Sequence, residues 1–319
     1  MPELNALAAK VLLAAFVLSV VFGAIAQRTH FCTMGALSDA YNMGDATRLR
    51  QWALAAGVAI LGFWALAAAG QVDPAKTLYS ATRWIWLSAA VGGALFGFGM
   101  VLASGCGSKN LVRIGGGSLK AVVVFLVLGL SAFATLKGIT AVARVGTVDK
   151  VGVDFAVPAL LPMALANVSG WSLATAGVVA ALLVGGGLVL WALAGRGFRS
   201  FDNLLAGFGL GAVIVGAWWV SGHLGHLAEH PETLEEAFIA TNSGRAEALS
   251  FVSPIAYTLD WIMFFSDTSK LLTVGIVSVF GVIVGSAIVS LLGRSFRWEG
   301  FGGTEDVANH LVGGLLMGV

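Results

Sequence analysis

The chain has 319 residues, of which 58% are apolar and only 11% are charged. Its mean hydropathy of +0.89 excludes an ordinary soluble protein, because about a quarter of the residues in such proteins are charged. Disorder requires low hydrophobicity and a high net charge, whereas the formal net charge here is +1. This near-zero charge offers no electrostatic footprint for nucleic acid. Two cysteines cannot form a disulfide framework, and 43 glycines without a Gly-X-Y period indicate closely packed helices.

Seven apolar runs of about twenty residues predict transmembrane helices, because a hydrocarbon layer roughly 30 Å thick selects helices of that length. The first run lacks the early basic residues and the cleavage motif of a signal peptide, so we expect it to be retained. An eighth run begins near Val307 and is still strongly hydrophobic at Val319, so we expect the chain to stop inside a membrane segment. The prediction is an all-α polytopic protein embedded in a lipid bilayer. The seven runs cover residues 7–26, 52–70, 84–103, 119–136, 173–195, 204–220 and 271–292.

The distribution of Lys and Arg predicts the orientation of the chain, because short cytoplasmic loops concentrate positive charge. When the loops are assigned alternately to two sides, one side has the shorter loops and more of the basic residues, and we take it as cytoplasmic. The segment 221–270 falls on the other side and is rich in Glu and Asp. The N-terminus is therefore expected on the periplasmic side. The basic residues assigned to the cytoplasmic side are Arg28, Arg48, Arg50, Lys109, Arg113, Lys120, Arg196, Arg199, Arg294 and Arg297.

The sequence resembles itself at separate places, as in many transporters built from two related halves. The glycine-rich run 91–99 is similar to the run 312–318, and both contain a Gly-x-x-x-Gly pair. The counterpart of Cys106 in the second half would fall beyond Val319, so we expect the second half to be truncated at its C-terminus. The expected organisation is a single transmembrane transporter domain over residues 1–319, with a first half of about 1–160 and a second half of about 161–319.

Cys106 lies between the third and fourth apolar runs and is flanked by Gly105 and Gly107. Irregular backbone at membrane depth persists only where it lines a cavity or is buried in protein. A re-entrant loop of this kind would expose backbone N–H groups that bind an anion. Lys109 and Arg113 would add positive charge on one face of a helix that follows. The alternative is a tight glycine turn in which Cys106 is a small buried apolar residue.

Cys32, the second cysteine, lies in a comparable setting. It follows the first apolar run directly, with Arg28, two threonines and Gly35 close by. A metal site is not expected, because two cysteines and His30 are too few ligands and no Cys-x-x-Cys spacing occurs. No cofactor is predicted either, since the sequence contains no serine elbow, phosphate-binding loop or nucleotide fingerprint.

Three histidines, His223, His226 and His230, have a spacing that would place them on one face of a helix. Such a cluster is compatible with a metal site or a proton relay. Glu229 and Glu232 lie beside them, and this acidic setting favours a solvated face at the membrane surface instead.

The stretches 31–35 and 104–113, with the glycine-rich helix before Cys106, resemble the YeeE/YedE family of bacterial inner-membrane proteins. The resemblance extends over nearly the whole chain. It implies a nine-helix fold with pseudo-symmetric halves, whose short re-entrant helices meet near the middle of the membrane. It also implies transport of thiosulfate past a line of cysteines, of which Cys32 and Cys106 match two, and a small cytoplasmic sulfur carrier of the TusA type as partner. The third cysteine of the family falls in the part of the second repeat that this sequence lacks.

The resulting hypothesis is a transporter that takes up thiosulfate, not an enzyme. Cys32 and Cys106 would pass the anion along through weak S–H hydrogen bonds, because binding must permit exit as well as entry. Gly105, Gly107, Lys109 and Arg113 would complete the path. Two alternatives stay open: a membrane redox enzyme that uses the two cysteines as a dithiol pair, and a channel for another sulfur or selenium oxyanion.

Overall fold

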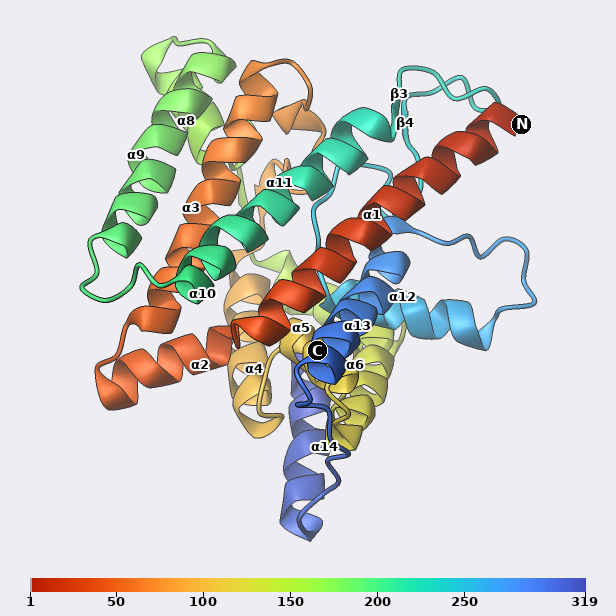
Figure 1. The fold of residues 1–319 in the computed structure, drawn as a ribbon. Coiled ribbons are helices and arrows are strands. Elements are labelled where there is room, and N and C mark those ends of the chain that lie inside the picture. Colours follow the sequence, from red (N-terminus) through yellow and green to blue (C-terminus); the bar gives the residue numbers. More distant parts are fainter. Residues whose placement is uncertain (1) are drawn as a thin grey trace.

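The computed structural model describes residues 2–319 and shows an all-α protein made of long apolar helices (Figure 1). Within these residues, seven helices are long and apolar enough to cross a membrane, which confirms the predicted fold class. Each predicted run coincides with one of them. Six of the long helices are single elements: α1 (Pro2–Arg28), α3 (Thr47–Ala68), α4 (Trp86–Leu102), α6 (Leu119–Lys137), α9 (Leu173–Leu193) and α13 (Val274–Leu292). The seventh is formed by four consecutive elements: α10 (Phe201–Leu204), η4 (Leu205–Gly209), α11 (Leu210–Trp219) and η5 (Val220–Leu224).

Shorter elements connect the long helices or follow them. The predicted eighth run forms α14 (Thr304–Gly318), and two antiparallel pairs, β1 with β2 and β3 with β4, are the strands of the described chain. The short elements are α2 (Thr33–Ser38), η1 (Asp39–Met43), η2 (Pro74–Lys76), β1 (Arg83–Trp84), α5 (Gly107–Gly115), α7 (Ile139–Gly146), η3 (Val148–Lys150), β2 (Val153–Asp154), α8 (Leu161–Ser169), β3 (His226–Leu227), β4 (Ala237–Phe238) and α12 (Val252–Met263).

Glycines let the long helices approach closely. The helix α1 packs along α13 (Figure 1), and a Cβ atom at Gly285 of α13 would overlap the carbonyl oxygen of Val20 in α1. The helix α14 packs against α4 and α6, and a Cβ atom at Gly313 would lie 2.7 Å from the carbonyl oxygen of Gly99 in α4. Small residues at helix interfaces permit this backbone-to-backbone packing, as the glycine content predicts.

The main core encloses the short helix α5. Leu111 and Val112 of α5 are fully buried and belong to one cluster with Leu128 of α6 and Val279 and Val282 of α13. A short helix held on several sides by long ones is fixed in position. The start of α5, where Cys106 lies, is therefore set by the core.

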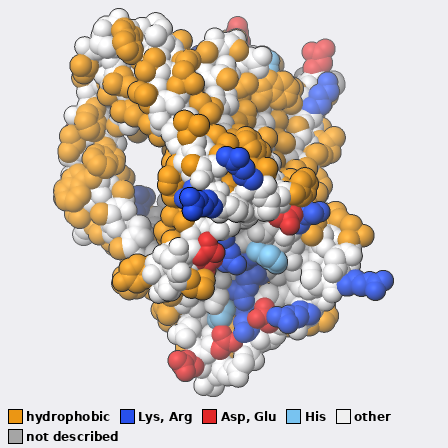
Figure 2. All heavy atoms as spheres, turned by 60° about the vertical axis from the view of Figure 1, so that its left-hand side comes forward, with side chains coloured by type: hydrophobic (Ala, Val, Ile, Leu, Met, Phe, Trp, Pro, Cys, Tyr) orange, Lys and Arg blue, Asp and Glu red, His pale blue; other side chains and the backbone are white. Residues whose placement is uncertain are grey.

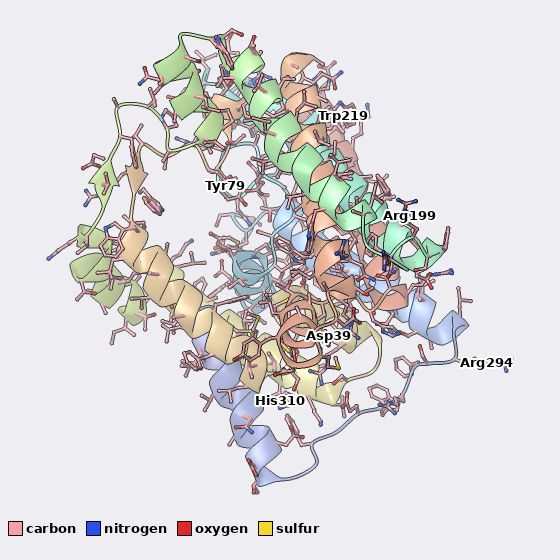
Figure 3. All side chains as sticks on the ribbon, turned by 90° about the vertical axis from the view of Figure 1, so that its left-hand side faces the viewer. Asp39, Tyr79, Arg199, Trp219, Arg294 and His310 are labelled. Carbon is pink, nitrogen blue, oxygen red and sulfur yellow. The ribbon has the colours of Figure 1, made fainter. Side chains whose placement is uncertain are left out.

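Large apolar side chains are exposed on the outward faces of the long helices, for example Leu183 and Leu190 of α9. On the face in Figure 2, hydrophobic side chains cover the upper part and charged side chains gather in the lower part. In Figure 3, Trp219 lies towards the upper end of the molecule and Arg294 and His310 towards the lower. So extensive an apolar surface is suited to contact with lipid. The protein is a multi-pass membrane protein.

His223, His226 and His230 do not share a helical face, so that prediction is wrong. His223 lies in η5, His226 in β3 and His230 in the loop that follows, because the helix ends at Leu224. The Nε2 atom of His226 lies 2.6 Å from a carboxylate oxygen of Glu236. Residues 2–319 contain no group of three or more side chains arranged to hold a metal ion.

Candidate functional site

Cys32 is the N-cap of α2. The chain leaves α1 through a turn in which His30 adopts a left-handed backbone, with φ of 53°. Cys32 itself is extended, and its Sγ accepts a hydrogen bond from the backbone N–H of Gly35 at 3.4 Å. A side chain that accepts this bond satisfies one of the unpaired amides at a helix start. The thiol is buried within the protein, with 8% of the residue exposed.

Cys106 is the N-cap of α5 and has the same place relative to its helix. The chain leaves α4 through Ser104 and Gly105, whose φ angles of 55° and 154° are both in the region that favours glycine. Cys106 follows in an extended conformation, and its Sγ lies 3.3 Å from the Oγ of Ser108. A Cβ atom at Gly105 would lie 2.9 Å from Cγ of Lys109. Gly105 therefore makes room for the lysine side chain as well as for the turn.

Asn110 fixes the turn that carries Cys106. Its side-chain Nδ2 donates hydrogen bonds to the carbonyl oxygens of Gly105 at 2.9 Å and of Cys106 at 3.1 Å. The residue is 1% exposed, and its Oδ1 has no hydrogen-bond partner in the protein. Sequence reasoning missed Asn110. The available signal was an amide four residues after the cysteine, where it can reach back to the carbonyls of the preceding turn.

Lys109 is the cation that the two cysteines share. Its side chain is half-buried and lies within electrostatic reach of Cys32, Cys106, Arg48 and Arg113. Among residues 2–319, Lys109 has no carboxylate partner, whereas each of the two arginines has one. Two buried thiols, at the N-caps of α2 and α5, therefore lie within electrostatic reach of one ammonium group that has no carboxylate partner among the described residues.

The two arginines border the site but are held in place. Arg113 donates to the carbonyl oxygen of Ala103 at 3.2 Å and lies 3.6 Å from Glu299. Arg48 lies 3.3 Å from Asp39, and its guanidinium also packs against Gly35 at the start of α2. Arg48 is a further residue that sequence reasoning did not single out, because only the folded chain brings α3 back onto α2.

A third short helix lies against the start of α5. A Cβ atom at Gly107 would make ordinary contacts, at 3.6 to 3.8 Å, with Val252, Phe251 and Ile255 at the beginning of α12. Of the six sequence-predicted site residues, Gly105 and Cys106 lie next to each other before α5, Gly105 makes room for the side chain of Lys109, and Lys109 lies within electrostatic reach of Cys32 and Cys106. Gly107 faces α12, and Arg113 is directed towards Ala103 and Glu299.

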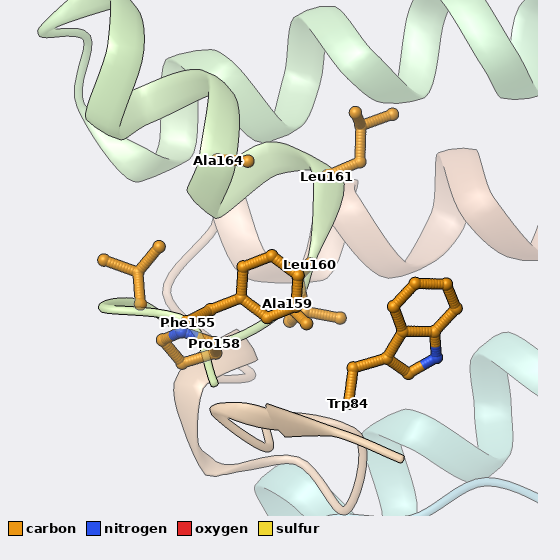
Figure 4. Close-up of a pocket in the computed structure, with 8 residues that line it drawn as sticks. Trp84, Phe155, Pro158, Ala159, Leu160, Leu161 and Ala164 are labelled. Atoms are coloured by element: carbon orange, nitrogen blue, oxygen red, sulfur yellow. The ribbon is translucent and has the colours of Figure 1, made fainter. Parts of the chain in front are cut away.

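The chemistry available at the site is that of two free thiols beside one positive charge. Thiols are weak hydrogen-bond donors, and the start of α5 adds backbone N–H groups at the positive end of a helix dipole. A different pocket of about 340 Å³ lies between Trp84, Phe155 and the start of α8 (Figure 4). Its lining residues are hydrophobic and none is Lys, Arg or His, so it offers no positive charge that would attract an anion.

Comparison with known proteins agrees with the resemblance at the cysteine segments. A family model described as sulphur transport matches residues 28–319. The chain is also 24% identical over 316 residues to the thiosulfate transporter TsuA of Escherichia coli (strain K12), and the alignment covers 96% of this chain and 82% of that protein. Because the family match covers most of the chain, the protein belongs to the sulphur-transport (YeeE/YedE) family.

Proposed function

We propose that this protein takes up thiosulfate across the bacterial inner membrane, along a path that includes Cys32 and Cys106. The observation that carries the proposal is that two buried, free thiols lie within electrostatic reach of Lys109. Family membership and the similarity to a thiosulfate transporter support it. Lys109 attracts the anion, and the two thiols bind it in turn.

The energetics favour weak donors on such a path. A dianion gives up its hydration only where other donors replace the lost water, because an unpaired charge in a low-dielectric interior is costly. Strong fixed charges on every side would hold the anion too tightly for release. One ammonium, two thiols and the backbone amides of α5 attract the anion and still allow it to leave.

Two further features belong to the proposal. Positive charge on the shorter loops supports a periplasmic N-terminus, and we take the direction of transport as inward. The division into two related halves, about 1–160 and 161–319, is supported by the way each half packs against the other. The helix α1 of the first half packs on α13 of the second, and α11 of the second half packs on α3 of the first. A sulfur carrier of the TusA type would receive the product on the cytoplasmic side.

Substitution of Cys106 tests the function. Cys106→Ala removes the second thiol donor, so we expect uptake of radiolabelled thiosulfate into cells that lack other uptake systems to fall by roughly tenfold or more, equivalent to about 1.4 kcal/mol. The control is Ser169→Ala, which removes an exposed hydroxyl at the end of α8 and should leave uptake unchanged. Both variants are compared at equal amounts of protein in the membrane. Undiminished uptake by Cys106→Ala would refute the proposed path.

The same cells separate transport from thiol redox chemistry. Thiols are trapped by alkylation during uptake and identified by mass spectrometry. Transport predicts that Cys32 and Cys106 stay reduced throughout. A disulfide between them that forms and disappears with turnover would favour the redox enzyme instead.

A further inference from the structure

Two adjoining cavities open on the side of the molecule formed by the segment between β4 and α13. Their volumes are about 230 and 360 Å³, and both are lined by Asn242 and Tyr257. Under the orientation proposed above, this is the periplasmic side. We call the smaller one the inner cavity and the larger one the outer cavity.

The inner cavity lies close to the cysteine site. It is lined by Ser253 in the first turn of α12 and by Leu249, which packs against the main core that encloses α5. Val252 and Ile255 of the same helix contact the position of Gly107, next to Cys106. The beginning of α12 therefore separates the inner cavity from the start of α5.

The outer cavity presents positive charge. It is lined by Lys137, at the end of α6, and by Lys270 and Asp260. Lys270 lies 2.6 Å from Asp260, so these two charges offset each other. Lys137 makes no ion pair with any residue that the structure describes and is exposed, and it gives the outer cavity a net attraction for anions.

The inner cavity contains a carboxyl group instead. Glu247 is half-buried there and accepts hydrogen bonds from the Ser243 hydroxyl at 2.8 Å and from the Asn242 backbone N–H at 3.4 Å. Burial raises the pKa of Glu247 above its usual value, and these hydrogen bonds only partly oppose the effect.

The groups around Glu247 do not supply a compensating cation. The titratable side chains that face it are Tyr79, from the loop after η2, and Tyr257, from α12. Arg245, on the same segment, donates to Ser80 at 3.3 Å, and Lys137 belongs to the adjoining cavity. An ionised Glu247 would therefore repel an anion that passes from the outer cavity to the inner one.

We propose that the two cavities are the entrance for the anion and that Glu247 is its proton-dependent gate. When Glu247 is ionised, it repels a dianion. When it takes a proton from the water on that side, its O–H donates a hydrogen bond to an oxygen of the anion, and no covalent bond is formed or broken apart from the carboxyl O–H. This inference rests on the proposed transport of an oxyanion and adds the residue that controls its admission.

The sign of the pH dependence follows from the raised pKa of Glu247. The admitting form is the protonated one, so uptake is greatest below that pKa and declines as the external pH rises through it. Thiosulfate itself stays doubly charged over this range. We expect uptake to fall by up to about tenfold per pH unit above the pKa, as for a single titrating group.

Glu247→Gln tests the gate, because glutamine has the same shape, carries no charge and keeps an N–H donor. The expected result is uptake that no longer depends on external pH and that exceeds the uptake of the unmodified protein on the alkaline side. The matched control is Glu232→Gln, an exposed carboxylate on the same side, which should keep the original pH profile. An unchanged pH profile in Glu247→Gln overturns the gate.

Infrared difference spectra of the purified protein distinguish failure of the gate from failure of the transport proposal. Addition of thiosulfate at a pH just above the Glu247 pKa should produce a protonated-carboxyl band that Glu247→Gln lacks. If the band is absent while uptake still depends on Cys106, the gate alone is wrong. If the unmodified protein takes up no thiosulfate at any pH, the proposed function is wrong and the gate with it.

Discussion

At the scale of single residues, the site depends on groups that hold the cysteines as much as on the cysteines themselves. Asn110 pairs the two carbonyl oxygens of the turn before α5, and Gly105 gives the Lys109 side chain its space. Each of these residues acts on Cys106 through the backbone. We expect a change in either one to move the thiol without altering its chemistry.

Replacement of Asn110 tests this role. Asn110→Ala leaves the buried carbonyl oxygens of Gly105 and Cys106 without their side-chain donor, which costs about 1–3 kcal/mol. We expect a lower unfolding temperature in detergent and reduced uptake. Asn42→Ala is the control, since Asn42 is exposed and bonds only to the Ser38 hydroxyl at 3.1 Å. Equal unfolding temperatures for the two variants would show that Asn110 does not hold the turn.

At the scale of elements, the long helices are packed through glycine and the short ones are placed by them. The core encloses α5 with α6 and α13, and α13 in turn packs along α1. A side chain added at the α1–α13 contact would push α13 away from α1. Because α13 also touches α5, the disturbance would reach the cysteine site.

Gly285→Val measures how closely α1 and α13 fit. The new side chain would overlap the backbone of Val20, and overpacking of this kind costs about 1–3 kcal/mol or more. The matched control is Gly186→Val in α9, where an added Cβ meets no atom within 4 Å. We expect the first variant to lose thermal stability in detergent and the second to keep most of it. Similar losses in both would contradict the packing described here.

Hydropathy predicts the long helices because the length of an apolar run reports the thickness of the bilayer directly. The run 119–136, for example, corresponds to α6 (Leu119–Lys137). The two cysteine turns were also predictable, since glycines and polar residues interrupt the apolar pattern there. The histidine prediction failed because spacing alone does not show where a helix ends, and η5 ends at Leu224.

The roles of Arg48 and Glu247 could not be predicted from the sequence, and for Asn110 the one signal was an amide four residues after Cys106. Each depends on a contact made only in the folded chain. Arg48 packs against Gly35, Asn110 reaches a turn whose shape depends on Ser104 and Gly105, and Glu247 lines a cavity closed by α12 and α13. These contacts cannot be inferred from the local amino-acid composition.

At the scale of the whole molecule, an apolar exterior and an apolar core enclose a small site that contains two buried thiols. Exposed leucines on helices such as α9 suit a lipid environment, while the thiols of Cys32 and Cys106 are buried. The account as a whole requires that one anion reaches both thiols. It also places the entrance on the acidic side, at the cavities beside Glu247.

Protection of the cysteines by substrate tests this requirement most directly. Purified Cys32→Ser and Cys106→Ser variants each keep one thiol, whose alkylation by a small maleimide is followed while thiosulfate is added. The account predicts that thiosulfate slows the labelling of both remaining thiols in a saturable manner and at similar concentrations. Labelling rates that thiosulfate leaves unchanged would contradict the claim that the two cysteines lie on one anion path.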